Sequence, residues 1–327
     1  MKKSILLICS TVLVLSASDV VMALYPAPYS VQNIRDEAKV ATAYEEYKNS
    51  KLSIRTSVGL QKGSSKEIVY NTDGTTLSEL TWETNSLYVA NIGLTYKPLE
   101  WLAFNFDYKL KVIDGSAVMD DYDWSNGASL PWSDWSHHDD TEVTNFNAID
   151  VSMDMRFFSS SYLDLLAIVG YKMDNTKWIA SGGTYEYNSG ADIGTFANGQ
   201  QVISYEQDYK TPYIGVKLNS EYKNITCSAR FIGSNMVEAT SKDIHFLRNL
   251  QFDESYSGGK MMNFNIALGY RLSNFTFNIA YEMNNYYLMK GDTDITDLST
   301  GETSKEPNSG GLSSESSVYS VGASYAF

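Results

Sequence analysis

Residues 102–112 read LAFNFDYKLKV, and this stretch decides the fold class. Leu102, Phe104 and Phe106 begin an apolar series at every second position, and from Asn105 onward polar or charged residues fill the positions between. Successive side chains of a β-strand point to opposite sides, so a period of two separates the two series onto opposite faces. The stretch therefore predicts a strand with one apolar and one polar face.

The same alternation recurs along most of the chain, for example in residues 149–157 and 275–283. It differs from the period of 3.6 residues that marks an amphipathic helix. Segments of this kind are expected to be strands, and ten can be counted, near residues 51–61, 78–96, 101–118, 142–158, 162–187, 200–219, 224–240, 260–272, 274–290 and 314–327.

Two architectures produce such strands: a secreted β-sandwich, which buries its apolar face, and a transmembrane barrel, whose apolar face contacts lipid. The segments run for about ten residues or more, whereas strands of globular proteins average about five or six. The chain is rich in tyrosine, with 24 residues, and its aromatic side chains gather at strand ends as in the girdles of membrane barrels. The sequence also closes with Tyr325-Ala326-Phe327, which resembles the assembly signal of outer-membrane barrels. We therefore predict an all-β, ten-stranded antiparallel transmembrane β-barrel in the outer membrane of a Gram-negative bacterium.

The connections between these segments alternate in length. The short ones are at 97–100, 159–161, 220–223 and 273, and the long polar ones are at 62–77, 114–141, 188–199, 241–259 and 291–313. Transmembrane barrels have short periplasmic turns and longer extracellular loops. The pattern predicts that the long connections face the outside of the cell.

Residues 1–23 have the features of a secretory signal peptide: a basic start, an apolar run too short to cross a bilayer, and a small-residue end. Cleavage is expected after Ala23, with Ala17 as the alternative. Residues 24–50 would then form an N-terminal periplasmic extension, and residues 51–327 the barrel. The formal net charge of −14 excludes a nucleic-acid partner, which requires a basic surface.

Long loops carry the function of such a scaffold, which could be a pore, an adhesin or an enzyme. A pore is disfavoured because side chains largely fill the interior of a small barrel. In the loop region 241–259, Asp243 and His245 are two residues apart, so on an extended strand the carboxylate can orient the imidazole and stabilise its protonated form. Asp121 and Asp123 have the same spacing and can form a pair of carboxylates that holds a water molecule.

Each of these pairs has a plainer interpretation as solvated surface charge. Residues 137–140, which read His-His-Asp-Asp, also suggest a metal site, although no further Cys or His is available to close it.

Two motifs add a family resemblance. Residues 132–138 read WSDWSHH, and the segment 170–185 begins Gly-Tyr and ends Gly-Gly-Thr-Tyr. With these motifs the chain, from about residue 51 to residue 327, is similar to the omptins, outer-membrane proteases with ten-stranded barrels. The resemblance implies an endopeptidase that cleaves polypeptides next to basic residues. The alternative is a catalytically silent omptin-like barrel that serves as an adhesin or invasin.

The resemblance also implies roles for single residues. Asp121 and Asp123 match the family's pair of aspartates, and Asp243 and His245 match its Asp-His dyad. His245 would be the general base that activates water, with Asp243 orienting it, and the scheme needs no metal and no cofactor.

Four more positions match motif or pocket positions of the family. Ser136 and His138 would support the site. Glu67 matches an acid at the base of the primary specificity pocket, and Asp134 matches an acid near the next subsite. A carboxylate there favours Lys or Arg through charge-assisted hydrogen bonds. One departure is Ser241, which stands where the family has the second acid of the primary pocket, so the preference for a basic residue is expected to be weaker or shifted.

A second departure concerns lipopolysaccharide, which activates omptins by binding basic residues on the outer face of the barrel. The matching positions here are Tyr171, Met173, Asn175 and Asp208. Only Tyr171 agrees with the family pattern, and Asp208 would repel a phosphate. Lipopolysaccharide binding is therefore expected to be weak or differently placed.

Overall fold

The computed structural model describes residues 50–125 and 131–327. Within them the chain forms strands and no helix, and consequently no helix there is long and apolar enough to cross a membrane. The strands are β1 (Leu52–Tyr70), β2 (Thr76–Leu99), β3 (Leu102–Lys111), β4 (Gly115–Asp123), β5 (Asp134–Ser159), β6 (Leu163–Ser181), β7 (Thr184–Tyr187), β8 (Asp192–Thr195), β9 (Gln201–Tyr222), β10 (Ile225–His245), β11 (Leu250–Leu272), β12 (Phe275–Asp297) and β13 (Thr303–Ala326). The predicted signal peptide and periplasmic extension lie outside the described residues, apart from residue 50.

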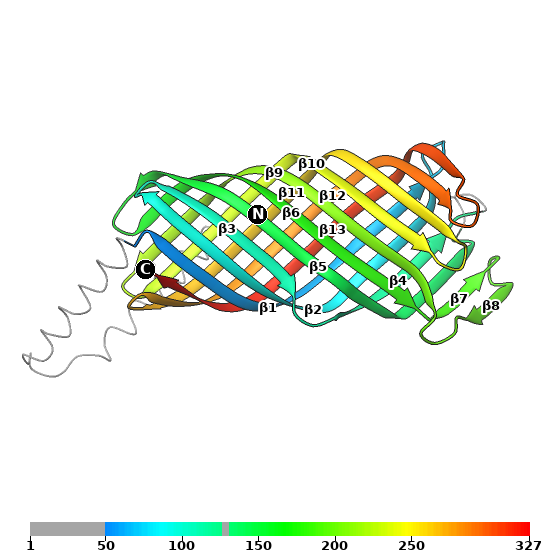
Figure 1. Cartoon of the computed structure of the whole chain (residues 1–327), viewed down its shortest axis with the longest axis horizontal. Coiled ribbons are helices and arrows are strands. Elements are labelled where there is room, and N and C mark those ends of the chain that lie inside the picture. The colour runs from blue at the N-terminus through cyan, green and yellow to red at the C-terminus, as the bar shows by residue number, and fades with distance from the viewer. Residues whose placement is uncertain (1–49, 126–130) are drawn as a thin grey trace, which may run out of the picture. The chain divides into compact units, whose positions relative to one another are not determined.

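The strands close into a barrel (Figure 1). Every pairing is antiparallel, and β1 pairs with β13, which joins the two ends of the sheet. β3 and β4 both lie between β2 and β5, so they are two halves of one barrel strand that is interrupted at residues 112–114. β7 and β8 form a hairpin that extends from β5. The ring therefore has ten strands, as predicted.

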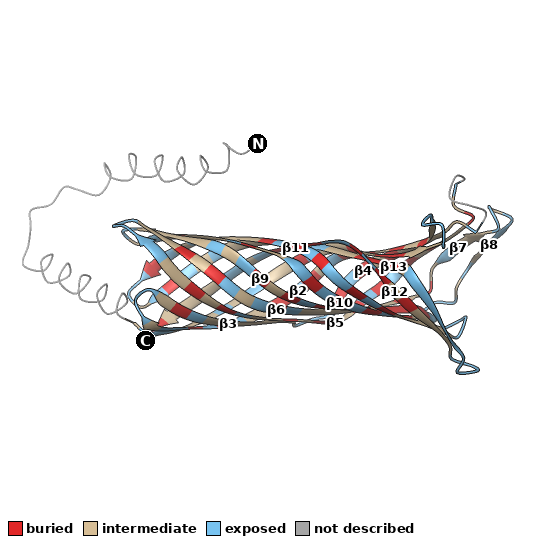
Figure 2. Ribbon diagram, turned by 90° about the horizontal axis from the view of Figure 1, so that it is seen from above, coloured by how far each residue is buried: buried red, intermediate tan, exposed pale blue. Residues whose placement is uncertain are grey.

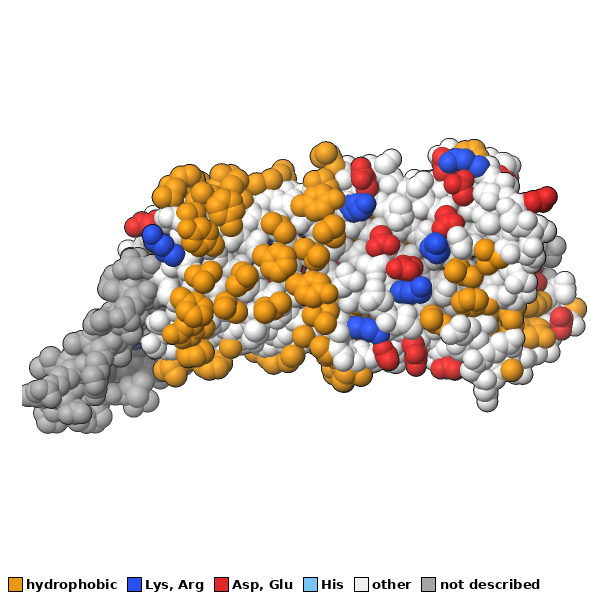
Figure 3. Space-filling view, viewed as in Figure 1, with side chains coloured by type: hydrophobic (Ala, Val, Ile, Leu, Met, Phe, Trp, Pro, Cys, Tyr) orange, Lys and Arg blue, Asp and Glu red, His pale blue; other side chains and the backbone are white. Residues whose placement is uncertain are grey.

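The outer face of the barrel carries a belt of apolar side chains. The alternating residues of β12 point outward, with Phe277 53% and Ile279 60% exposed, and Val321 of the neighbouring strand is 57% exposed. In Figure 3 the hydrophobic side chains gather on one half of the barrel, and the charged side chains on the other. An apolar patch of this size is stable only in contact with lipid, so the belt marks the membrane-spanning half.

The strands extend far beyond this belt, and the expected loop lengths were therefore wrong. The stretches predicted as loops at 62–77, 241–259 and 291–313 are mostly strand, and the connections that remain are residues 71–75, 246–249 and 298–302. Above the membrane both faces of a strand contact polar surroundings, so the apolar alternation disappears while the backbone pairing continues. The four short turns were predicted correctly and span residues 100–101, 160–162, 223–224 and 273–274.

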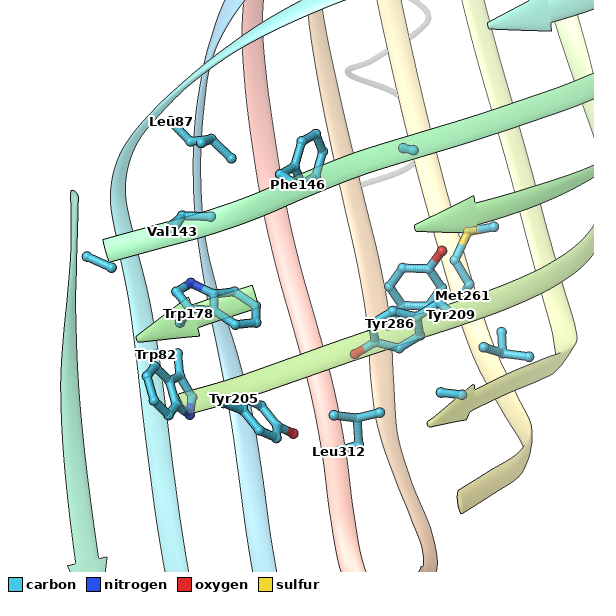
Figure 4. Packing of buried hydrophobic residues seen from close by; sticks show 14 of the residues in the cluster. Trp82, Leu87, Val143, Phe146, Trp178, Tyr205, Tyr209, Met261, Tyr286 and Leu312 are labelled. Atoms are coloured by element: carbon cyan, nitrogen blue, oxygen red, sulfur yellow. The ribbon is translucent and has the colours of Figure 1, made fainter. Parts of the chain in front are cut away.

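Side chains fill the barrel below its outer mouth. Trp82 stacks on Tyr205, with ring centroids 5.5 Å apart, and Trp178 lies 6.1 Å from each of them (Figure 4). In Figure 2 buried and exposed residues alternate along the strands, as expected for one face turned inward and one outward. The aromatic layer forms a floor that separates the mouth from the membrane-spanning interior.

A β-bulge in β10 changes which residues face inward. Gly233 pairs with Ile214 of β9, and Glu238 pairs with Lys210. Between these two pairs β10 has one residue more than β9. Below the bulge Phe231 faces lipid at an odd position, whereas above it the odd-numbered residues are the buried ones. Without this reset of parity, the outward-facing series that includes Phe231 would also include the Asp-His pair.

Candidate active site

The Asp-His dyad lies at the upper end of β10. Asp243 and His245 are two residues apart on the strand and share its inner face, where Nε2 of the imidazole lies 2.6 Å from Oδ2 of the carboxylate. Their side chains are 2% and 12% exposed. Burial opposes protonation of the ring, but the negative charge and hydrogen bond of Asp243 outweigh it and raise the pKa of His245. The dyad can therefore hold a proton on its imidazole.

The hydrogen bonds of the three histidines single out His245. His137 uses both ring nitrogens, with Asp120 at 2.8 Å and Asp139 at 2.9 Å. His138 also uses both, with Ser136 Oγ at 3.0 Å and the carbonyl oxygen of Gly182. Nδ1 of His245 has no hydrogen-bond partner among the described residues, so it is the imidazole nitrogen free to accept a proton.

The aspartate pair faces this dyad from the other side of the mouth. Asp121 and Asp123 lie at the end of β4, in the third barrel strand, and His245 lies in the seventh. Both carboxylates are close enough for their charges to act on His245. Ser78 Oγ donates a hydrogen bond to Oδ1 of Asp121 at 3.3 Å. The structure thus brings together the four residues predicted to be catalytic.

The environment of the pair changes its protonation. Burial, followed by the negative charge of Asp123, raises the pKa of Asp121 to about 7. Burial likewise raises the pKa of Asp123. Near neutral pH Asp121 therefore carries a proton part of the time, and the two carboxyl groups titrate as a pair.

Glu67 of β1 is buried in the same mouth and is 1% exposed. Its Oε2 has no hydrogen-bond partner within the described parts of the chain. Burial is the main cause of its strongly raised pKa, and the charges of Asp243 and Glu254 add to it. An unsatisfied buried carboxyl group is costly, so its position calls for a partner that the folded chain does not supply.

Sequence reasoning missed Glu254. This residue of β11 is 3% exposed and is the register partner of Ser241 on β10. Its Oε2 accepts hydrogen bonds from Ser241 Oγ at 2.6 Å and from the hydroxyl of Tyr256, and its Oε1 accepts one from Thr293 Oγ1 at 3.1 Å. Burial raises the pKa of Glu254, and the three hydrogen bonds offset part of that rise. The sequence predicts a loop at residues 241–259, and a loop gives no reason to place Glu254 beside Ser241.

The remaining predicted residues lie on or beside β5. Ser136 is the register partner of Asp121, and its hydroxyl links that position to the buried ring of His138. Asp134 accepts hydrogen bonds from Ser133 Oγ at 2.6 Å and from the backbone N–H of Asn188 at 3.0 Å. Asp134 therefore ties the β7–β8 hairpin to the rim of the mouth.

The structure does not support a metal site at residues 137–140, because the two histidines there cannot bind the same ion. His137 and His138 are neighbours on a strand and point to opposite faces of β5, and both nitrogens of each ring are already hydrogen-bonded. No group of three or more His, Cys, Asp or Glu side chains among the described residues is arranged to hold a metal ion.

These features define a class of protein: a ten-stranded outer-membrane β-barrel whose mouth holds an Asp-His dyad and a group of further carboxyl groups. The Omptin family model matches residues 48–327, so the chain belongs to the omptin family.

Relatives and a solved structure agree with this assignment. The chain is 29% identical over 278 residues to the plasminogen activator of Yersinia pestis, covering 84% of this chain and 89% of that protein. It is 24% identical over 298 residues to the outer membrane protease OmpP of Escherichia coli, covering 88% and 94%. The crystal structure of the outer membrane protease OmpT from Escherichia coli superposes with a TM-score of 0.81 at 24% identity, covering 85% of this chain and 97% of that one.

Proposed function

We propose that this barrel is an outer-membrane endopeptidase whose active site opens to the outside of the cell. The observation that carries the proposal is Nδ1 of His245, which has no hydrogen-bond partner among the described residues; Asp243 holds this ring opposite the carboxyl groups of Asp121 and Asp123. The relatives named as outer-membrane proteases support the same reading.

The proposed reaction is hydrolysis by an activated water molecule. The Asp121–Asp123 pair holds the water opposite His245, and Nδ1 of the imidazole removes its proton as the water oxygen attacks the peptide carbonyl carbon. Asp243 fixes the ring and stabilises the imidazolium. The imidazolium then gives the proton to the departing amine nitrogen as the C–N bond breaks, which leaves a carboxylic acid and an amine. No covalent enzyme intermediate forms, and every proton is carried by a side chain of the chain itself.

We propose that the substrates are polypeptides with basic residues at the cleavage point. The mouth holds several buried or half-buried carboxyl groups, and Oε2 of Glu67 has no hydrogen-bond partner among the residues that the structure describes. A guanidinium or ammonium group entering this pocket would form charge-assisted hydrogen bonds that a neutral side chain cannot offer. Asp134 at the rim supplies a further negative charge for an adjacent basic residue.

The activity can be tested with a fluorogenic peptide that carries paired basic residues. The wild-type barrel should cleave it, and His245→Ala should reduce the rate by at least about 10³-fold because the general base is lost. His137→Ala is the matched control, since that ring lies on the outer side of β5. No cleavage above background by either wild type or His245→Ala would favour the silent barrel that acts as an adhesin. A chelator should leave the wild-type rate unchanged.

We also propose that lipopolysaccharide binds weakly or at another place than in other omptins. Asn175 donates hydrogen bonds to Asp208 at 2.8 Å and to Glu206 at 2.9 Å, so acidic side chains occupy the outer face at these positions. Lys177 pairs with Glu206, its Nζ 3.3 Å from Oε2, whereas Asp208 has no ion-pair partner among the described residues, so the charge of Asp208 disfavours a phosphate group here. Addition of lipopolysaccharide should raise the activity little, and Asp208→Lys should increase the response. Strong activation that Asp208→Lys leaves unchanged would contradict this proposal.

A further inference from the structure

We propose that Glu254 is the second acid of the primary specificity pocket and that, together with Glu67, it binds the cationic side chain of the substrate residue at the cleavage point. This inference rests on the proposed endopeptidase function. Glu254 would supply from β11 the negative charge that Ser241 fails to supply from β10. The two carboxyl groups of Glu67 and Glu254 are called the anionic pocket below.

The side chain of Glu254 extends along the barrel wall toward Glu67. Its Oε1 is bonded to Thr293 on β12 and lies 2.7 Å from the point that a Cβ on Gly310 of β13 would occupy. β13 is the neighbour of β1, and Gly310 is the register partner of Val69, two residues from Glu67. The glycine therefore leaves the space through which one acid approaches the other.

The anionic pocket has no positive charge of its own. Neither Glu67 nor Glu254 forms an ion pair with any residue in the described ranges 50–125 and 131–327, and Oε2 of Glu67 has no hydrogen-bond partner there. Lys242, which follows Ser241, points outward, with its Nζ 3.6 Å from Oδ1 of Asp253. Burial of two acids without a cation raises the pKa of both, and a cation that arrives with the substrate would favour their ionised forms.

The walls of the anionic pocket suit a long basic side chain. Leu80 and Leu312 are the register partners of Glu67 on either side, and both are buried. Apolar walls around a charged end favour Lys or Arg, whose methylene stems pack on apolar surface while the head group reaches the acids. Three hydrogen bonds hold the carboxylate of Glu254 in place, so it does not need to reorganise when the cation binds.

The test compares two peptides that carry either arginine or citrulline, its neutral isostere, at the cleavage point. Glu254→Gln should lower kcat/KM for the arginine peptide about 10- to 100-fold, mainly through KM, because one charge-assisted interaction is lost. The rate on the citrulline peptide should change little. The double variant Ser241→Asp with Glu254→Ser returns an acid to the neighbouring strand and should restore most of the preference for arginine.

Two outcomes would overturn the proposal. One is no loss of kcat/KM on the arginine peptide in Glu254→Gln, and the other is an equal loss on both peptides, which would indicate a structural defect. Asp253→Asn, on the same strand but on the outer side, is the matched control and should behave as wild type. Retention of the heat-resistant compact form on electrophoresis checks that each variant is folded.

A binding measurement separates this proposal from the endopeptidase function. The His245→Ala barrel should bind the uncleaved arginine peptide more tightly than the citrulline peptide, and adding Glu254→Gln should remove the difference. If the wild type cleaves neither peptide but this difference is present, the anionic pocket stands and the proteolytic function fails. If cleavage occurs and the difference is absent, the function stands and the role of Glu254 fails.

Discussion

Asp243→Asn is the change that tests the dyad most directly. The carboxylate lies 2.6 Å from Nε2 of His245, and both side chains are shielded from solvent. A hydrogen bond to a charged group contributes about 1.5–3 kcal/mol, and one pKa unit corresponds to about 1.4 kcal/mol. Removal of the negative charge should therefore lower the pKa of His245.

The substitution should reduce the rate more than this shift alone implies. When the amide NH2 of the new side chain faces Nε2, the ring must carry its own proton on Nδ1, the nitrogen that is meant to accept one from water. An asparagine that traps the wrong tautomer lowers kcat by about 10⁴-fold in other Asp-His systems. We expect a loss of about 10³- to 10⁴-fold here, equivalent to about 4–5.5 kcal/mol of transition-state stabilisation.

The assay is cleavage of a fluorogenic peptide with paired basic residues, followed from pH 5 to pH 9. Asp253→Asn, which makes the same chemical change on the outer side of β11, should retain the wild-type rate. The acid limb of the residual activity of Asp243→Asn should move to lower pH. The role given to Asp243 would be refuted if Asp243→Asn kept more than about a tenth of the wild-type kcat with its acid limb unmoved.

Four further predictions follow from the described geometry. Because His245 acts unprotonated and its pKa is raised above 6.5, wild-type activity should rise with pH and reach half its maximum above pH 6.5 in a pH-rate profile. The raised pKa of Asp121, about 7, means that the folded state holds this proton more tightly than the unfolded state, so the melting temperature should fall from pH 4 to pH 7, and by less in Asp121→Asn. Trp82→Ala removes one of the three rings of the aromatic floor and should lower the free energy of unfolding in detergent by about 3–5 kcal/mol. Trp101→Ala, at an exposed position, should change this free energy little. Gly310→Ala places a methyl group 2.7 Å from Glu254 Oε1 and should raise KM for an arginine peptide with kcat nearly unchanged, and Gly233→Ala, whose Cβ meets only a backbone oxygen at 3.5 Å, is its control.

The membrane-spanning half of the fold could be predicted because lipid imposes a pattern on the sequence. Where one face of a strand contacts hydrocarbon, every second residue must be apolar, as in residues 275–283. Above the membrane this requirement ends, and β12 continues to Asp297 without an apolar series on its outer face. Backbone hydrogen bonds hold these upper strands together, and they form with almost any side chain. The length of the upper strands could therefore not be predicted from the sequence.

The candidate site was predictable only in part, for a similar reason. The spacing of Asp243 and His245 is local and visible in the sequence. The position of Glu254 depends on its pairing with Ser241, a contact between two strands that the sequence does not reveal. The three histidines also look alike in sequence, and only their hydrogen-bond partners separate His245 from the two whose nitrogens are both occupied.

The extended strands explain how a barrel can hold reacting groups in fixed positions. Asp243 is paired on one side with Tyr205 and on the other with Phe252, so its backbone is part of a continuous ladder rather than a mobile loop tip. A site on such a wall is more precisely positioned than one on loops. The one extra residue between Gly233 and Glu238 therefore determines which side chains of β10 face into the mouth. A one-residue change of register exchanges the two faces of a strand, so without the bulge β10 would direct its dyad outward and Lys242 inward.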